Sequence, residues 1–207
     1  MPIMDQHAAE EHFRTLVPIR DPILERMERD AKARNIPIVG PSMGNLLYLL
    51  AVTSGSQKIL ELGTATGYST IWLARAAKQL QGRVHTYEKD PKLAQEAKRN
   101  LHEAGYTVIA QVFNEDVLAA LPQMNDTYSL IFVDVDKADY AQILPDMVDL
   151  LKPRGLLIAD NASFEEAREF NKKVAALDGF DTAFLHGFFA GHSPERDGLA
   201  VARKRVA

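Results

Sequence analysis

The sequence contains no cysteine among its 207 residues. This absence excludes disulfide bonds, thiolate nucleophiles and cysteine-based zinc sites. The sequence also lacks an apolar run of the ~20 residues that a membrane-spanning helix requires. Its first 14 residues contain no hydrophobic segment of the kind that a signal peptide carries. We therefore expect a soluble, cytoplasmic protein with no membrane partner.

An excess of basic residues is absent as well. Lysine and arginine total 24 against 28 aspartate and glutamate residues, which gives a net charge of -4. Proteins that coat nucleic acids are normally basic, so this balance argues against that class but leaves an RNA substrate open. The apolar share of 46% is ordinary for a globular protein, and the length fits one α/β domain.

From residue 57 onward, short apolar segments alternate with amphipathic ones. This alternation is typical of βαβ units around a mostly parallel sheet. The expected strands are 58–62, 83–88, 107–112, 129–134, 156–160, 180–186 and 199–203. The expected helices are 68–80, 90–105, 138–151 and one that begins at 163. Asp90 and Pro91 are typical of a helix start, and Ser163 and Glu166 have the spacing of a capping box. We expect Pro145 to bend or divide the third of these helices, and residues 152–155 to form a turn.

Residues 1–56 have a different pattern, which predicts helices at about 5–16, 21–35 and 43–53. No flexible linker separates them from the rest of the chain. We interpret this part as a helical N-terminal extension of a single domain, 1–207, whose α/β core is 57–207.

Three features at expected strand ends indicate a nucleotide-like ligand. They are the glycine-containing turn 61–69, the carboxylate of Glu88 and the carboxylate of Asp116. In open α/β sheets, ligands bind beyond the carboxyl ends of the strands. Glu88 can accept hydrogen bonds from both ribose hydroxyls, and Asp116 lies where an adenine edge would be. For the glycines alone, the competing interpretation is a turn that serves only packing.

The acid in the turn discriminates between two cofactors. The pattern is E-x-G-x-x-x-G, from Glu61 to Gly67, and it lacks the third glycine of a dinucleotide site. A negative charge at Glu61 disfavours a pyrophosphate but suits the ammonium group of S-adenosylmethionine. The sequence therefore favours S-adenosylmethionine, and an NAD-dependent oxidoreductase is the alternative.

Two expected strands end in an acidic residue, Asp134 and Asp160. If these strands are neighbours, they lie about 4.8 Å apart, and their two carboxylates can converge on one cation. Asn161 follows directly and can add an amide oxygen. Such a donor set suits Mg²⁺. The alternative is that each aspartate merely caps the loop after its strand.

Lys137 lies three residues after Asp134. A free lysine, with a pKa of about 10.4, is a poor base at neutral pH. A nearby metal cation would lower the pKa of this lysine and would also acidify a bound hydroxyl group. Lys137 is therefore the candidate base, and a solvated lysine in an acidic loop is the alternative.

These residues resemble the cation-dependent O-methyltransferases related to caffeoyl-CoA and catechol O-methyltransferases, especially the small bacterial members. The resemblance runs from about residue 37 to the C-terminus. Its most specific segments are 59–69, 132–137, 160–161 and 197–204. It implies a Rossmann-like class I methyltransferase fold with a seven-stranded, mostly parallel sheet, the last strand antiparallel, and helices on both faces. It also implies a homodimer.

The resemblance implies a role for each matching position. The methionine part of the cofactor would contact Glu61, Gly63, Gly67, Tyr68 and Ser69, with Gly40 in a segment that closes over it. The ribose would be held by Glu88, and the adenine by Asp116 and the Val117 backbone. Asp134 would border the cofactor and, with Asp160 and Asn161, would hold the metal. Lys137 would be the base.

The chain departs from the family after Asp160-Asn161. Family members commonly carry a longer segment there, with a tryptophan and a glycine that border the acceptor. Here a helical segment follows within two residues, so we expect a more open acceptor site. The predicted acceptor is a catechol-like small molecule with vicinal oxygens. The alternatives are a hydroxylated RNA base and a non-catalytic cofactor binder. His186 and His192 border this side or, more commonly for such residues, pack a loop.

Overall fold

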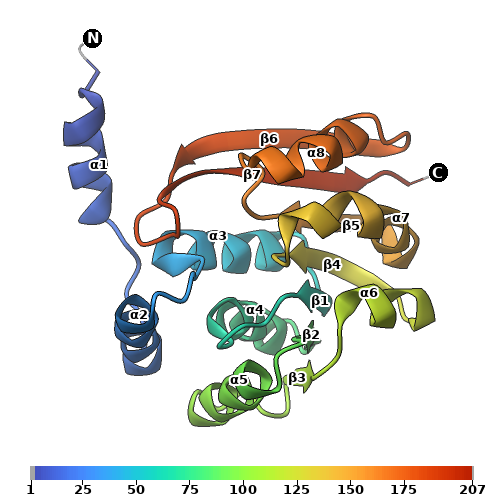
Figure 1. The fold of residues 1–207 in the computed structure, drawn as a ribbon, viewed down its shortest axis with the longest axis horizontal. Helices are drawn as coiled ribbons and strands as arrows, with labels where there is room; N and C mark the ends of the chain where they lie inside the picture. The colour runs from blue at the N-terminus through green and yellow to red at the C-terminus, as the bar shows by residue number, and fades with distance from the viewer. Residues whose placement is uncertain (1–2, 207) are drawn as a thin grey trace.

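The computed structural model describes residues 3–206, and its strands form one sheet in the order β3-β2-β1-β4-β5-β7-β6 (Figure 1). The strands are β1 (Lys58–Leu62), β2 (Arg83–Tyr87), β3 (Ala110–Phe113), β4 (Tyr128–Val133), β5 (Leu151–Ala159), β6 (Phe180–Phe188) and β7 (Arg196–Lys204). The first five are parallel to one another, and β7 is antiparallel to both β5 and β6. The predicted seven-stranded sheet with an antiparallel last strand is confirmed.

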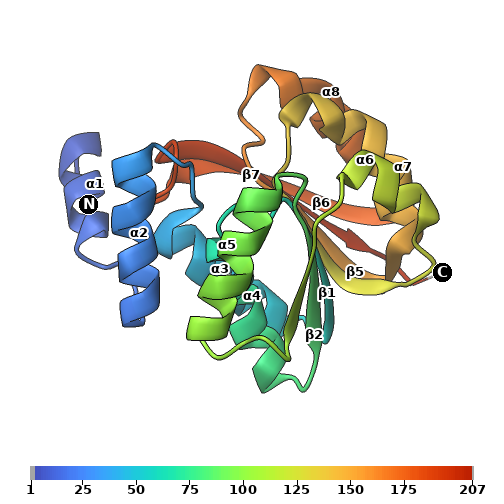
Figure 2. The same ribbon diagram turned by 60° about the horizontal axis from the view of Figure 1, so that its bottom comes forward.

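Helices cover both faces of the sheet, as Figure 2 shows. They are α1 (Gln6–Arg14), α2 (Pro22–Arg34), α3 (Gly40–Thr53), α4 (Tyr68–Gln79), α5 (Pro91–Glu103), α6 (Val117–Ala120), α7 (Tyr140–Leu150) and α8 (Arg168–Ala175). Helices α2 to α5 pack on one face and α6 to α8 on the other. None of the helices in the described part of the chain has both the length and the apolar character to cross a membrane.

The central strands are apolar on both faces because each face meets a helix layer. In β4, Leu130 and Phe132 pack against α2 to α5, whereas Ile131 and Val133 pack against α6 to α8. All four side chains are fully buried. Successive side chains of a strand point to opposite faces, so a continuous apolar run is what a strand between two helix layers needs.

Several element boundaries differ from the prediction. Strand β3 begins at Ala110, because residues 107–109 form a turn in which the Ala110 amide donates to the Tyr106 carbonyl. Residues 152–155 are part of β5 and form an irregularity in its pairing with β4, with Arg154 at a φ of 67°. Pro145 lies inside α7 but does not divide it.

Two further boundaries differ near the expected site. Helix α3 begins at Gly40, three residues before the predicted start. Ser163 does not cap a helix, because its hydroxyl donates to Asp197; a short 3-10 turn, Glu165–Ala167, leads instead into α8. Strands β6 and β7 are longer than predicted, so the loop that joins them is residues 189–195.

Candidate active site

A cleft lies at the carboxyl ends of β1, β2 and β4. Its empty volume is about 770 Å³, which includes the part that is open to solvent. It is lined by residues 37–39, 63–66, Tyr68, Ser69, 87–89, 116–118, 134–136 and Asp139. Its position is the one expected for a ligand of an open α/β sheet.

Gly63 allows β1 and β4 to approach each other at the floor of the cleft. Its φ is 100°, and an added Cβ would lie 2.1 Å from the carbonyl oxygen of Asp134. The Asp134 amide in turn donates to the Leu62 carbonyl. A side chain at position 63 would therefore separate the two strand ends that carry the candidate site.

Glu61 lies beneath the cleft rather than on its wall, because its side chain is fully buried. One of its carboxylate oxygens accepts a hydrogen bond from Thr70, and the other, Oε1, has no partner. Burial raises the pKa of Glu61 to about 7. A buried acceptor without a donor is uncommon. A cationic ligand in the cleft, directly or through a water molecule, would satisfy it.

Glu88 and Asp116 both reach the cleft wall and are held there by backbone amides. Glu88 accepts from the amides of Ala65 and Asp90 at 2.8 and 2.9 Å. Asp116 caps α6 through a 2.9 Å hydrogen bond from the Leu118 amide. Each carboxylate retains lone pairs for a hydroxyl or amino group.

Gly40 and Gly67 do not line the cleft. An added Cβ at Gly40 would lie 2.2 Å from the carbonyl oxygen of Gly191, so this glycine allows the 189–195 loop to pack against α3. Gly67 precedes α4 with a φ of 88° and lies against Ala97. Both residues shape the backbone around the cleft.

Asp134 and Asp160 follow directly after a matched pair of strand residues, because Val133 and Ala159 are partners in the β4–β5 ladder. The Tyr140 hydroxyl donates to the carbonyls of Val133 and Asp160 and ties the two strand ends together. Burial and the charge of Asp160 raise the pKa of Asp134, although Lys137 opposes this effect. The charge of Asp160 therefore acts on Asp134 across the two strand ends.

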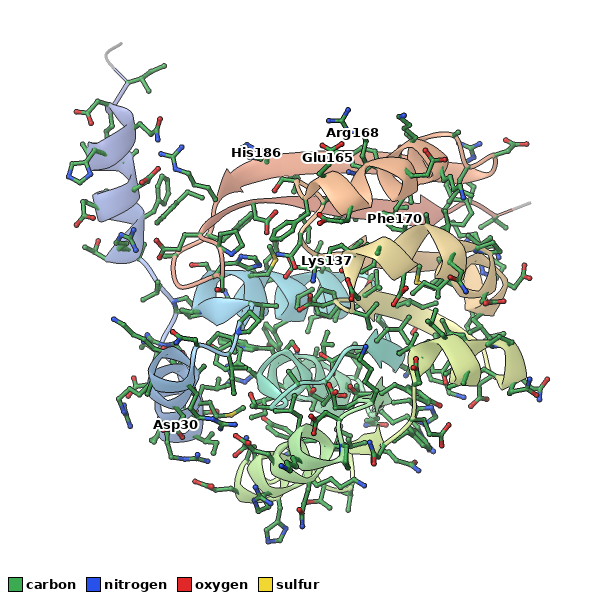
Figure 3. All side chains as sticks on the ribbon, in the orientation of Figure 1. Asp30, Lys137, Glu165, Arg168, Phe170 and His186 are labelled. Carbon is green, nitrogen blue, oxygen red and sulfur yellow. The ribbon has the colours of Figure 1, made fainter. Side chains whose placement is uncertain are left out.

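Lys137 lies in the 3-10 turn that follows β4, near the middle of the view in Figure 3. Its Nζ atom donates to Asp134 Oδ1 at 2.8 Å and to the Val135 carbonyl at 3.0 Å. The side chain is 19% exposed. The ammonium group thus balances part of the acidic charge at this point.

Asn161 is oriented by Asp197, which begins the DGLA segment of β7. The Asn161 Nδ2 atom donates to Asp197 Oδ2 at 2.5 Å, and the other Asp197 oxygen accepts from Ser163 and from the Gly198 amide. A carboxylate can only accept, so this contact fixes which end of the Asn161 amide is nitrogen. The amide oxygen of Asn161 is left to face another partner.

His192 was not predicted to be part of this group. It is buried, and its Nε2 atom lies 2.9 and 3.1 Å from the two oxygens of Asp160. Burial lowers the pKa of His192, but the hydrogen bond and charge of Asp160 more than offset this, so its pKa lies above the ordinary value. Within residues 3–206, Asp160, His192 and Asp197 bring ligand atoms within 4.8 Å of one another.

The predicted positions therefore fall into three groups. Seven of them line the cleft: Gly63, Tyr68, Ser69, Glu88, Asp116, Val117 and Asp134. Gly40, Glu61 and Gly67 lie behind this lining. The metal candidates and Lys137 gather beside it at the ends of β4 and β5. The sequence offered one usable signal for Asp197, its place in the family-like segment 197–204. His192 was expected to border the acceptor side or to pack a loop, but no local pattern joins it to Asp160, 32 residues away.

Comparison with known proteins gives a consistent result. A family model described as O-methyltransferase matches residues 18–178. A catechol O-methyltransferase of Niastella koreensis is 35% identical over 182 residues, covering 79% of this chain and 80% of that protein. A catechol O-methyltransferase of Mycobacterium tuberculosis is 35% identical over 144 residues, covering 68% of this chain and 65% of that protein.

Solved structures share the whole fold. The O-methyltransferase TomG of Streptomyces achromogenes, solved with S-adenosylmethionine, has a TM-score of 0.86 and 25% identity, covering 99% of this chain and 100% of that one. An O-methyltransferase of Bacillus cereus, solved with S-adenosylhomocysteine, has a TM-score of 0.84 and 27% identity, covering 96% of this chain and 97% of that one. An oxidoreductase is not supported by any of these matches.

Proposed function

This chain belongs to the O-methyltransferase family, and from that premise we propose that it methylates a catechol-like small molecule with the help of a divalent metal ion. The methyl donor of the family is S-adenosylmethionine, as the neighbouring structures indicate. The NAD-dependent alternative is abandoned because the family assignment excludes it.

One observation carries the proposal: the pairing of β4 with β5 brings Asp134 and Asp160 to adjacent positions beside the cleft. Asp134 also forms part of the cleft wall. A group held by these carboxylates would therefore lie next to the bound donor, which is the arrangement that methyl transfer to a neighbouring oxygen requires.

In this proposal, the cleft residues bind and orient the donor. Glu88 accepts hydrogen bonds from the ribose hydroxyls, and Asp116 with the Val117 backbone meets the adenine. The unpartnered oxygen of Glu61 compensates the positive charge of the methionine part. Gly40 and Gly67 act through the backbone that surrounds the donor rather than by direct contact.

The donor set fits a divalent ion. Asp134, Asp160 and Asn161 offer two carboxylates and one amide oxygen, whose orientation Asp197 sets. A hard ion such as Mg²⁺ prefers oxygen ligands of this kind. When bound, the metal would lower the pKa of an acceptor hydroxyl. Asp134, Asp160 and Asn161 would thereby hold the acceptor beside the donor, and alignment of this kind contributes about 7–11 kcal/mol.

Lys137 is the proposed base. Its Nζ atom already lies among the acidic groups, 2.8 Å from Asp134. It would first lose a proton to solvent, since the side chain is partly exposed. As a neutral amine it would then accept the hydroxyl proton of the acceptor.

The acceptor side is proposed to lie beyond His192. An open cavity there is lined by α2, the start of α3 and the 189–195 loop, and it shares Pro37 and Ile38 with the donor cleft. Because the segment after Asn161 is short, the β6–β7 loop borders this side of the site. The alternative acceptor is a macromolecule, a hydroxylated RNA base, and it is the weaker candidate.

The proposal is tested by an activity screen with S-adenosylmethionine. Catechols are compared with matched monophenols and with hydroxylated RNA, each with Mg²⁺ and with excess chelator. We expect turnover on catechols that chelator abolishes, and no turnover for Asp160→Ala, with the exposed Glu166→Ala as control. Activity that is equal with and without chelator would refute the metal role, and turnover on RNA alone would refute the acceptor.

A further inference from the structure

We propose that His192 is a fourth protein ligand of the divalent ion, so that this chain holds its metal in a mixed nitrogen and oxygen site. The inference rests on the proposed function above and adds a ligand from the β6–β7 loop. It begins from the close approach of His192 to Asp160, which joins two parts of the chain that lie 32 residues apart.

The hydrogen bond at Nδ1 fixes the form of the ring that a metal would meet. Nδ1 lies 2.6 Å from the carbonyl oxygen of Pro194. A carbonyl oxygen only accepts, so Nδ1 carries the hydrogen and donates it. In a neutral imidazole, Nε2 is then the nitrogen with a free lone pair, and Nε2 faces Asp160. Histidines that bind metals nearly always donate their other N–H in this way.

The spacing between Nε2 and Asp160 suits two ligands of one ion. The distances to the two carboxylate oxygens are 2.9 and 3.1 Å. Two ligand atoms at right angles on an octahedral ion, each about 2.1 Å from it, are about 3.0 Å apart. An imidazolium ring without metal would make a hydrogen bond of the same length, and coordinated nitrogen detected on a bound ion distinguishes the two states.

The loop holds His192 in place before any ligand arrives. Gly191 packs against Gly40 and Pro41 at the start of α3. The His192 amide donates to the Phe189 carbonyl at 3.0 Å, and the Phe189 amide donates to the Glu195 carbonyl at 2.7 Å. The side chain of His192 is only 1% exposed. A ligand that is buried and already positioned loses little conformational entropy on binding.

Asp197 has a different part in the site. Its oxygens accept from Asn161, Ser163 and the Gly198 amide. With three of its roughly four acceptor sites committed to these donors, Asp197 acts in this proposal by orienting the Asn161 amide. It is therefore a positioning residue for the proposed metal ligands.

A nitrogen ligand changes which ion the site prefers. Oxygen-only sites suit Mg²⁺, whereas imidazole favours first-row transition ions. We therefore expect this chain to bind Mn²⁺ and its heavier neighbours in preference to Mg²⁺.

The test measures metal binding by the metal-free full chain. Calorimetric titrations give the Mn²⁺ and Mg²⁺ affinities, and pulsed electron paramagnetic resonance of bound Mn²⁺ detects coordinated nitrogen. The variants are His192→Gln and, as matched control, His186→Gln; His186 is exposed on β6, away from Lys137 (Figure 3). We expect a histidine nitrogen signal that only His192→Gln removes, with Mn²⁺ affinity about 10–100-fold weaker and Mg²⁺ affinity changed less.

Two results would overturn the inference, and they differ in what they mean for the proposed function. Mn²⁺ bound without a nitrogen signal shows that His192 is not a ligand, while the oxygen site survives. No Mn²⁺ binding, together with methyl transfer that resists chelator, removes both. Wild-type protein labelled with ¹⁵N-histidine decides the question even if His192→Gln does not fold, because the label must change the nitrogen signal.

Discussion

At the scale of single residues, the hydrogen bonds of Lys137 and the burial of Glu61 determine the roles that we expect for these two side chains. Lys137 donates to an aspartate and a carbonyl at the centre of the site. Glu61 is buried with one oxygen unpartnered. The first is expected to act in the chemistry, and the second in binding of the donor.

Lys137→Ala should lower turnover by about 10²–10⁴-fold, the usual contribution of a general acid or base. The affinity for S-adenosylmethionine should change little, because Lys137 does not line the donor cleft. Steady-state kinetics and calorimetry check both expectations. The control is Lys172→Ala, an exposed lysine on α8. Equal turnover in the two variants would exclude Lys137 from the mechanism.

Glu61 predicts a pH dependence of stability. Burial raises its pKa from 4.5 to about 7, so the folded state holds a proton that the unfolded state has lost between these values. Its stabilising contribution is therefore present below pH 4.5 and is lost as the pH rises through about 7. Glu61→Gln cannot titrate. We expect the wild type to lose stability relative to Glu61→Gln between pH 5 and pH 8, measured by urea denaturation without the donor. Parallel profiles would contradict this.

At the scale of elements, the turn between β1 and α4 determines whether the two strand ends can approach. An added Cβ at Gly63 would overlap the Asp134 carbonyl, whereas one at Gly105 would meet nothing within 4 Å. Both glycines have positive φ, of 100° and 76°. Alanine substitutions at these two positions therefore allow the cost of backbone strain to be separated from the cost of steric overlap.

Gly105→Ala should cost about 1–2 kcal/mol of stability, the penalty for a left-handed L-residue. Gly63→Ala should cost roughly 2–5 kcal/mol, because overpacking adds about 1–3 kcal/mol to that penalty. It should also weaken binding of S-adenosylmethionine. Urea denaturation and calorimetric titration measure these effects. Equal losses of stability in the two variants would show that Asp134 moves aside without cost.

Most elements could be predicted because their signals are local. Asp90 and Pro91 predicted the start of α5, and the Asp90 side chain does accept from the Lys92 and Leu93 amides. The capping interpretation of Ser163 was wrong, because its hydroxyl has a partner 34 residues away in Asp197. A cap is a local competition that a tertiary hydrogen bond can override.

At the scale of the whole molecule, α1 stands apart from the sheet (Figure 1), and none of its residues is buried. It is held by ion pairs from Arg14 to Glu195 and from Arg196 to Glu10. Ile19, in the segment that joins α1 to α2, is 94% exposed. A second copy of the chain that covers this region would account for the exposed apolar side chains.

The family resemblance implies a homodimer, and we propose that this region forms its interface. The protein should then have twice the chain mass of 23.0 kDa in sedimentation equilibrium. Ile19→Glu should weaken it, since a charge would have to be buried in the interface. The control is Val108→Glu, at a side chain that is 92% exposed between α5 and β3. A monomeric wild type, or equal dissociation of both variants, would refute this interface.

The sequence alone determined the strands, the helices and the positions of the acids, because apolar periodicity and turn chemistry act over a few residues. It placed Asp134 and Asp160 at strand ends, and sheet pairing then made them neighbours. Only the tertiary structure decided the partners of Asp160 and Asn161. His192 reaches Asp160 across 32 residues, through a loop whose path depends on how Gly191 packs against α3. Asp197 reaches Asn161 across 36 residues, from strand β7. No local pattern encodes such a contact, since the free energy that favours it comes from burial shared by distant segments.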